Sequence, residues 1–297
     1  MWGLLKKTLI FLGLLAFKPI TSKPVEFFPI LRGITMVDSS AYPVVVLHGL
    51  ESSSSELEPL CDWLETTFNK KVYNMEIGNG KKTSTYSSLN DQLDELCDSI
   101  YDIKELKTGF DFIGISQGGL LARGYVERCN AFRVRNLITF VTPHGGIYWS
   151  KAPNNELMYN SFFQTFISIA SYWRNPTILD TYLTCCSYLP IINNEFWCNE
   201  ESTIHRQNIR NLSNFVMIWS PNDLVLSPPE SAKFSFYDED FNVVPLEHTE
   251  LYKNDSLGLK DLNYRNALHI YETNCSHIDH RNPVCFDQLS DILKRFL

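Results

Sequence analysis

The nine residues DFIGISQGG, at positions 111–119, place a serine between two glycines, directly after an apolar run and directly before a helix-type sequence. This is the G-x-S-x-G pattern, in which a sharp strand-to-helix turn holds the serine in strained backbone geometry, with its hydroxyl exposed above the sheet. Gly114 and Gly118 avoid side-chain clashes with the neighbouring strand and helix. Ser116 therefore has the surroundings of a nucleophile; the alternative is an inert serine in a tight turn.

A nucleophilic serine needs N–H donors for the oxyanion that forms when it attacks a carbonyl. The backbone N–H of Gln117 directly follows the serine at the start of the predicted helix, whose dipole also favours negative charge at that end. The second donor should come from the loop after an early strand, LHGLESSSS, and we predict that it is the N–H of Leu50. His48 precedes the serine in the chain and stands in an HG pair, so we expect it to anchor this loop rather than to act in catalysis.

The acid of such a site follows the serine in the chain, and the histidine comes last. Asp223 lies in FVMIWSPNDLVLSP, just beyond a convincing strand end, where a carboxylate can orient an imidazole and stabilise its charged form. An aspartate that only caps the turn is the alternative. Asp238 and Asp240, in FYDEDF, are the reserve candidates for the acid.

The base is expected in the loop CSHIDHRNP, which lies between the last apolar run and the final helix. This loop offers His277 and His280, and both remain candidates. His269 lies inside the apolar run NALHIYE and is interpreted as a strand residue. A serine, an acid and a histidine in this order can transfer an acyl group, and the scheme requires no metal and no cofactor.

Short β-branched runs alternate with longer helical ones from Tyr42 onward, which indicates parallel strands joined by crossover helices. We therefore predict an α/β-hydrolase fold, with a mostly parallel sheet, helices on both faces and an aromatic-rich helical insertion. Strands are predicted at 43–49, 71–78, 109–116, 134–143, 215–220 and around His269, and helices at 54–68, 89–100, 117–129 and 286–297. The stretch 78–85 is interpreted as a turn-rich connection.

The interval 147–210 breaks this alternation, because it is rich in aromatic residues and too long for a simple connection. One interpretation is a helical cap that buries its own aromatic side chains. The other is that part of its apolar surface lines a groove for a hydrophobic substrate. The same surface could touch a lipid bilayer.

The N-terminus predicts a secretory signal peptide at 1–22, because two lysines precede a short apolar run from Leu9 to Phe17 and a small polar stretch. That run is about half the length of a membrane-spanning helix, which argues against the alternative of a membrane anchor. Residues 23–297 are predicted to form a single domain.

The cysteines agree with export from the cytosol. There are eight, none forms a C-x-x-C pair, and this argues against a metal site. Cys185 or Cys186 with Cys198, and Cys275 with Cys285, are spaced as clips on local loops, and Cys97 and Cys129 fall on helices before and after the serine-bearing strand. Sequons at Asn211, Asn254 and Asn274 are usable only in a secretory protein. The net charge of -8, without a basic cluster, argues against nucleic acid as a partner.

These residues taken together resemble the palmitoyl-protein thioesterases, and more closely the lysosomal thioesterase branch of that family. The matching stretches are VVVLHGLESSSSELEPLCDWL, GFDFIGISQGGLLARGYVERC, WSPNDLVLSP, FSFYDEDFNVVPLEHTELYKNDSLGLKDL and CSH. The resemblance implies Ser116 as nucleophile, Asp223 as acid and His277, preceded by a serine, as base. It also implies a glycosylated lysosomal enzyme that removes long acyl chains from thioesters.

The triad itself serves thioesters and oxygen esters alike, so a lipase or lysophospholipid esterase is the alternative enzyme. The sequence TPHGG at 142–146 is also met in lipases, although Ile115 stands where many lipases carry a histidine. A secreted lipid-binding protein that kept the fold and lost its activity is the alternative from another class. An intact serine, acid and histidine in the right order argue against it.

Overall fold

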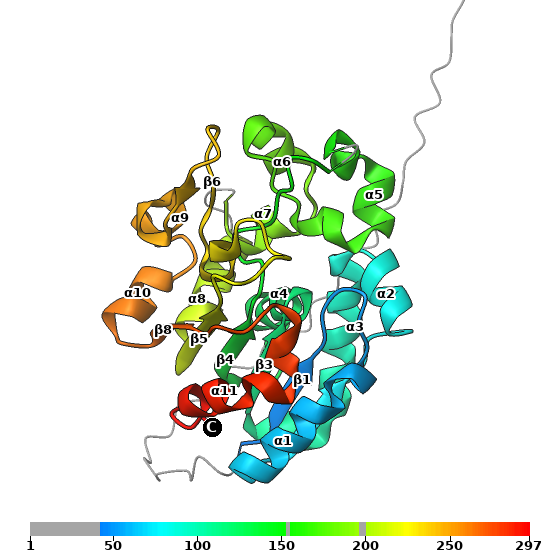
Figure 1. Cartoon of the computed structure of the whole chain (residues 1–297), viewed down its shortest axis with the longest axis vertical. Helices are drawn as coiled ribbons and strands as arrows, with labels where there is room; N and C mark the ends of the chain where they lie inside the picture. The colour runs from blue at the N-terminus through cyan, green and yellow to red at the C-terminus, as the bar shows by residue number, and fades with distance from the viewer. Residues whose placement is uncertain (1–41, 153–154, 196–199) are drawn as a thin grey trace, which may run out of the picture. The chain divides into compact units, whose positions relative to one another are not determined.

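The computed structural model describes residues 42–152, 155–195 and 200–297, so the signal peptide predicted at 1–22 lies outside the described residues. A six-stranded parallel sheet runs through this part of the chain, in the order β2-β1-β3-β4-β5-β8 (Figure 1). Its strands are β1 (Val44–Leu47), β2 (Val72–Met75), β3 (Phe110–Ile115), β4 (Val134–Phe140), β5 (Asn214–Trp219) and β8 (Leu268–Glu272). Every neighbouring pair is parallel.

The central strands are continuous apolar runs because helices cover both faces of the sheet. All residues of β1 and β3 are buried, whereas β8, at one edge, is half exposed. Alternate residues of β1 point to opposite faces: Val45 and Leu47 belong to one apolar cluster, and Val44 and Val46 to the other.

The helices divide between the two faces in the same way (Figure 1). The cluster around Val44 is closed by α1 (Glu58–Phe68) and α11 (Phe286–Leu293). The cluster around Val45 is closed by α3 (Leu89–Asp102), α4 (Gln117–Gly124) and α8 (Glu200–Arg210). The predicted fold class, a parallel sheet covered on both faces, is confirmed.

The remaining elements lie between the strands. They are α2 (Lys81–Tyr86), α5 (Ser161–Phe166), α6 (Leu179–Cys185), α7 (Leu189–Ile192), α9 (Glu250–Lys253), α10 (Leu259–Tyr264) and the antiparallel hairpin β6 (Phe236–Tyr237) with β7 (Val243–Val244). Short 3₁₀ turns include η2 (Ser54–Leu57), η6 (Ser168–Tyr172) and η10 (Ile278–Arg281). Within the described ranges, no helix combines the length and the apolar character needed to cross a bilayer.

Three local predictions need correction. The segment 78–85 is not all turn, because α2 occupies Lys81–Tyr86 after Gly80, which has a positive φ of 51°. The helix predicted to run to 129 ends as an α-helix at Gly124 and continues as a π-helical turn, η4 (Tyr125–Cys129). The closing helix ends at Leu293 rather than at the last residue.

The hairpin β6–β7 was not predicted, because strands of two residues are too short to show the alternation of apolar and polar residues that indicates a strand.

Two disulfides tie these elements together. Cys97 of α3 is bonded to Cys129 of η4, with the Cα atoms 6.1 Å apart, and Cys275 is bonded to Cys285, with the Cα atoms 5.9 Å apart. The predicted clip with Cys198 concerns a residue outside the described ranges. Among the described residues, Cys61, Cys185 and Cys186 are free.

Some aromatic side chains of the 147–210 segment fit a cap that buries its own aromatic residues, and others fit the wall of a substrate groove. Tyr159, Tyr182 and Tyr188 are buried in the core, as a self-packed cap requires. Trp149 and Tyr172 line a cavity, and Tyr172 is at the same time buried in the core. Phe162 and Phe166 of α5 are exposed.

Candidate active site

Ser116 occupies the turn between β3 and α4 with φ of 53° and ψ of −126°, a conformation that is uncommon for a residue with a side chain. The turn is held from both sides, because the N–H of Ser116 donates to the carbonyl of Phe140 at 2.8 Å and the carbonyl of Ser116 accepts from the N–H of Gly119 at 2.9 Å. Such strain persists only where the surroundings over-determine it. The backbone therefore fixes where the hydroxyl points.

The glycines of the turn are required by close backbone contacts. A Cβ at Gly114 would lie 2.5 Å from the Cα of Gly119, and a Cβ at Gly118 would lie 2.3 Å from the carbonyl oxygen of His48. Real Cβ atoms do not approach backbone atoms so closely. A side chain at either position would push α4 away from the ends of β1 and β3.

The side chains of Ser116, His277 and Asp223 form one hydrogen-bonded chain. His277 Nε2 lies 3.0 Å from Ser116 Oγ, and His277 Nδ1 lies 2.7 Å from Asp223 Oδ2. The other carboxylate oxygen of Asp223 accepts the N–H groups of Val225 at 2.8 Å and Leu226 at 2.9 Å. These bonds leave Oδ2 free for the imidazole, so Nδ1 carries the ring proton and Nε2 can accept the proton of the serine.

The reserve residues lie elsewhere. His280 is buried, with its Nδ1 2.8 Å from the carbonyl of Ser276 and its Nε2 2.8 Å from Thr273 Oγ1. Burial lowers the pKa of His280, which favours the neutral form of this ring. Asp238 accepts the N–H groups of Asp240 and Asn242 in the exposed turn of the β6–β7 hairpin. Among the described residues, no hydrogen bond joins His280, Asp238 or Asp240 to the side chain of Ser116 or of His277.

The two predicted oxyanion donors flank the serine. Leu50 follows β1 and lines the same cavity as Ser116, and a Cβ built on the preceding Gly49 would lie 3.0 Å from Ser116 Cβ. The loop after β1 therefore passes directly over the nucleophile turn. Gln117 begins α4, where the N–H groups of the first turn have no partners within the helix.

The side chain of Gln117 is fixed by contacts that the sequence did not reveal. Its Nε2 donates to the carbonyl of Ser84 in α2 at 2.9 Å, and its Oε1 accepts from the hydroxyl of Tyr172 at 3.1 Å. Burial raises the pKa of Tyr172, so this hydroxyl stays protonated and donates. The residue beside the nucleophile is thus held by a helix on one side and by the aromatic segment on the other.

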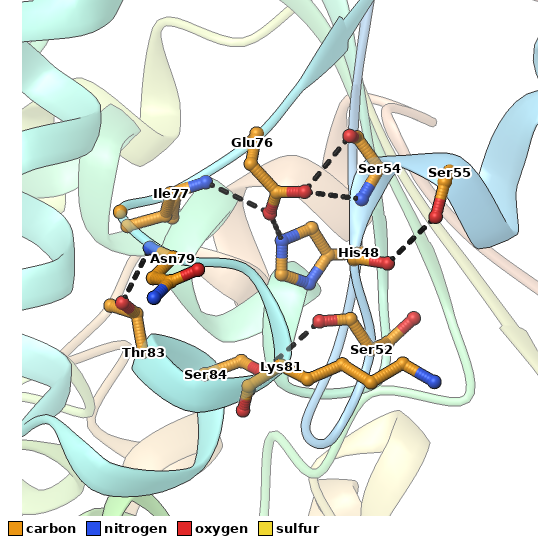
Figure 2. A network of polar contacts seen from close by, with 12 residues as sticks. His48, Ser52, Ser54, Ser55, Glu76, Ile77, Asn79, Lys81, Thr83 and Ser84 are labelled. Carbon is orange, nitrogen blue, oxygen red and sulfur yellow. Dashed lines mark hydrogen bonds and ion pairs between the residues drawn. The ribbon is translucent and has the colours of Figure 1, made fainter.

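His48 lies at the centre of the polar network in Figure 2. It is buried, and its Nε2 is 2.5 Å from Glu76 Oε1. The second oxygen of Glu76 accepts both the N–H and the hydroxyl of Ser54, each at 2.9 Å. His48 and Glu76 together hold the two ends of the loop that contains Leu50, which is the anchoring position expected for His48.

A cavity of about 280 Å³ opens on Ser116 and His277. Most of its wall is apolar, including Leu57, Ile147, Trp149, Ile169 and Leu226. A cavity of about 350 Å³ lies at α6 and the β6–β7 hairpin. Its described lining residues include none of Ser116, Asp223 and His277, so the smaller cavity is the one that serves the reactive groups.

The disulfide Cys275–Cys285 closes the loop that carries His277, with ten residues of separation. Replacing both cysteines with serine is expected to lower the free energy of unfolding by roughly 3 kcal/mol, because the unfolded chain regains the entropy of that loop. Urea denaturation of the purified variant measures this change.

The variant that lacks Cys97 and Cys129 is the comparison for that experiment, because the disulfide that it removes joins α3 to η4 and does not close the His277 loop. Its longer loop predicts a similar or larger loss of stability, of roughly 4 kcal/mol. Below the unfolding transition this comparison variant should keep its activity, while the variant without Cys275 and Cys285 should lose activity as its histidine loop loosens. Equal activity of the two variants would contradict a positioning effect of the Cys275–Cys285 disulfide.

The parallel sheet, together with the three residues at the carboxyl ends of its strands, defines the class of protein. Ser116 follows β3, Asp223 follows β5 and His277 follows β8, so all three leave the carboxyl ends of parallel strands and meet at one edge. This is the arrangement of a serine hydrolase with the α/β-hydrolase fold.

The chain belongs to the palmitoyl protein thioesterase family, whose model matches residues 43–277. It is 36% identical over 253 residues to palmitoyl-protein thioesterase 3 of Dictyostelium discoideum, covering 82% of this chain and 87% of that protein. It is 30% identical over 262 residues to lysosomal thioesterase PPT2-B of Xenopus laevis, covering 80% and 87%. A solved structure of a lipase-esterase related protein from Clostridium acetobutylicum aligns with a TM-score of 0.47 and 13% identity, covering 87% of this chain and 95% of that one.

Proposed function

We propose that this protein hydrolyses long-chain fatty acyl thioesters through an acyl-serine intermediate on Ser116. The observation that carries the proposal is the chain from Ser116 Oγ to His277 at 3.0 Å and from His277 to Asp223 at 2.7 Å, with Ser116 and His277 lining a mainly apolar cavity. The family supports the leaving group, because its members are named as thioesterases.

In this mechanism His277 takes the proton of Ser116 as the hydroxyl attacks the acyl carbonyl, and Asp223 stabilises the imidazolium that results. The N–H groups of Leu50 and Gln117 stabilise the tetrahedral oxyanion. The carbon–sulfur bond breaks and the thiol leaves with the proton from His277. Water, deprotonated by the same histidine, then hydrolyses the acyl-serine and frees the fatty acid.

A thiol leaving group needs little help from the general acid, because the pKa of a thiol is about 8.5. An oxygen ester releases a far more basic alkoxide and depends more strongly on protonation by His277. The sequence TPHGG, which is also met in lipases, does not support the oxygen-ester alternative, because its histidine, His144, does not line the cavity of Ser116. His144 is buried, stacks on Phe234 and lies 3.0 Å from Thr139 Oγ1.

The acyl chain is proposed to lie along the apolar wall, and apolar side chains continue outward from it. Leu224 is 94% exposed, and Val225 and Ile278, which line the cavity, are also exposed. These residues are suited to peripheral contact with a lipid surface from which an acyl chain could enter. Residues 23–297 would then act as one catalytic domain, with the 147–210 insertion covering the cavity.

We place the protein in the secretory pathway, and within it in the lysosome. Relatives such as the Xenopus laevis protein are named as lysosomal thioesterases. Two disulfides, which form in oxidising compartments, support this location.

The substrate class is tested by comparing the purified protein on palmitoyl-CoA, an S-palmitoyl peptide, a p-nitrophenyl ester and a phospholipid. The two thioesters are expected to have the higher kcat/KM, by about tenfold or more, which corresponds to about 1.4 kcal/mol of transition-state stabilisation. A preference for the oxygen esters would make the protein a lipase or lysophospholipid esterase. Binding of acyl chains without turnover of any substrate would make it a lipid-binding protein.

A further inference from the structure

Arg281 joins two loops that are far apart in the sequence. It lies in η10, four residues after His277, and its Nη1 donates to Ser52 Oγ at 2.9 Å and to Glu56 Oε2 at 2.6 Å. Ser52 is two residues beyond Leu50, in the loop after β1, and its own hydroxyl donates to Glu56 Oε2 at 3.0 Å. The loop that carries the histidine is therefore bonded to the loop that carries a predicted oxyanion donor.

The chain of contacts continues from Ser52 to the nucleophile turn. The carbonyl of Ser52 accepts from Ser84 Oγ at 3.2 Å, and the carbonyl of Ser84 accepts from Gln117 Nε2 at 2.9 Å. Because Ser116 itself contacts His277, the path returns to its starting loop. It connects the elements that carry the nucleophile, the base and both oxyanion donors.

We propose that Arg281 is a positioning residue for the hydrolysis: through Ser52 and Glu56 it sets the distance between the oxyanion loop and His277. The inference rests on the proposed function of Ser116 and His277. Both acceptors are bonded to Nη1 of Arg281, whose two N–H bonds lie in the guanidinium plane and have fixed directions, whereas the ammonium group of a lysine rotates freely.

A contribution to overall stability is the weaker explanation for this contact. Arg281 and Glu56 have exposed side-chain fractions of 24% and 26%, and ion pairs this accessible to water add little to the free energy of unfolding. Small displacements in an active site are costly by comparison, because a misplacement of about 1 Å can lower the rate roughly 100-fold.

Arg281 also lines the cavity, so recognition of an anionic leaving group is the competing role. The charge of Arg281 is matched by Glu56, which additionally forms an ion pair with Lys81. The two roles differ in their dependence on substrate charge. A positioning role affects every substrate, whereas an anion site affects acyl-CoA and spares a neutral ester.

The test measures kcat and KM of Arg281→Gln and Ser52→Ala on palmitoyl-CoA and on neutral p-nitrophenyl palmitate. Both variants are expected to lower kcat on both substrates, Arg281→Gln by roughly 10- to 100-fold and Ser52→Ala by roughly tenfold, with KM changed less than about twofold. Arg281→Lys, which keeps the charge, should recover part of the loss. Arg265→Gln is the matched control, because it removes an ion pair with Asp261 just before the amino-terminal end of β8, whereas the reactive groups follow the carboxyl ends of the strands, and it should leave kcat unchanged.

Wild-type kcat in both Arg281→Gln and Ser52→Ala would overturn the inference, and so would a rise of KM confined to palmitoyl-CoA. If Arg281→Gln does not fold, Ser52→Ala decides the question, because it removes one hydroxyl and leaves the Arg281–Glu56 pair in place. Ser116→Ala is measured alongside. Full activity in Ser116→Ala means that the proposed function has failed, whereas an inactive Ser116→Ala beside an unaffected Ser52→Ala and Arg281→Gln means that only the positioning role has failed.

Discussion

Replacing Ser116 with alanine is expected to lower kcat for palmitoyl-CoA by roughly 10⁶-fold, because no acyl-serine can form. The cavity keeps its apolar wall, so binding of a palmitoyl chain should survive the substitution. Single-turnover assays with excess enzyme, together with equilibrium binding of palmitate, measure the two effects separately.

Ser290→Ala, on α11, is the control for the loss of a serine hydroxyl, and it should hydrolyse acyl-CoA at the wild-type rate. Labelling with a fluorophosphonate adds a direct readout, because this reagent bonds to an activated serine. The wild-type protein and Ser290→Ala should be labelled and Ser116→Ala should not. Persistence of hydrolysis in Ser116→Ala would remove this residue from the mechanism.

Asp223→Asn should lower kcat by about 10⁴-fold while the protein stays folded. Oδ1 of Asp223 accepts two backbone N–H groups, so the amide oxygen of an asparagine takes that side. Its NH₂ group then faces Nδ1 of His277 and forces the ring proton onto Nε2. In that tautomer the ring cannot accept the proton of Ser116.

Asp238→Asn is the comparison variant, because Asp238 is the reserve acid and lies in the turn of the β6–β7 hairpin. We expect its kcat to stay within about twofold of the wild-type value, as for most surface substitutions away from a site. The reverse result, with Asp238→Asn inactive and Asp223→Asn active, would reassign the acid.

The sheet and the nucleophile turn could be predicted from the sequence because their signals are local. β1 and β3 are short apolar runs next to turn residues, and the position of Ser116 follows from five consecutive residues. The helix predicted at 89–100 is α3, which runs from Leu89 to Asp102; its signal is local as well, because Leu89, Leu93 and Leu96 recur at helical spacing.

The order and placement of the motifs left both His277 and His280 as candidates for the base, and only the family resemblance favoured His277. Both histidines stand in one short loop, where neither spacing nor composition indicates which ring faces Ser116. In the structure, His280 is hydrogen-bonded to Thr273 and Ser276 of its own loop, and His277 is hydrogen-bonded to Ser116.

The contacts of Gln117 and Arg281 could not be predicted because their partners are distant in the chain. Ser84 lies 33 residues before Gln117, and Ser52 lies 229 residues before Arg281. Serine and arginine are common surface residues, and only the closure of the fold brings these pairs together. The position of Ser84 was also not predicted, because it lies in α2, whose sequence KKTSTY has no apolar periodicity that would indicate a helix.

Glu56, the partner of Arg281, is suited to keep its charge in acidic solution. The hydrogen bond from Lys81, with further contributions from Ser52 and Arg281, lowers the pKa of Glu56 below its usual 4.5. A carboxylate whose pKa is lowered in the folded state keeps its stabilising charge above the ordinary value and loses it only when the pH falls through the lowered one. At the pH that half-protonates an ordinary glutamate, Glu56 is therefore more than half ionised, and the bridge between the two loops keeps most of its charge.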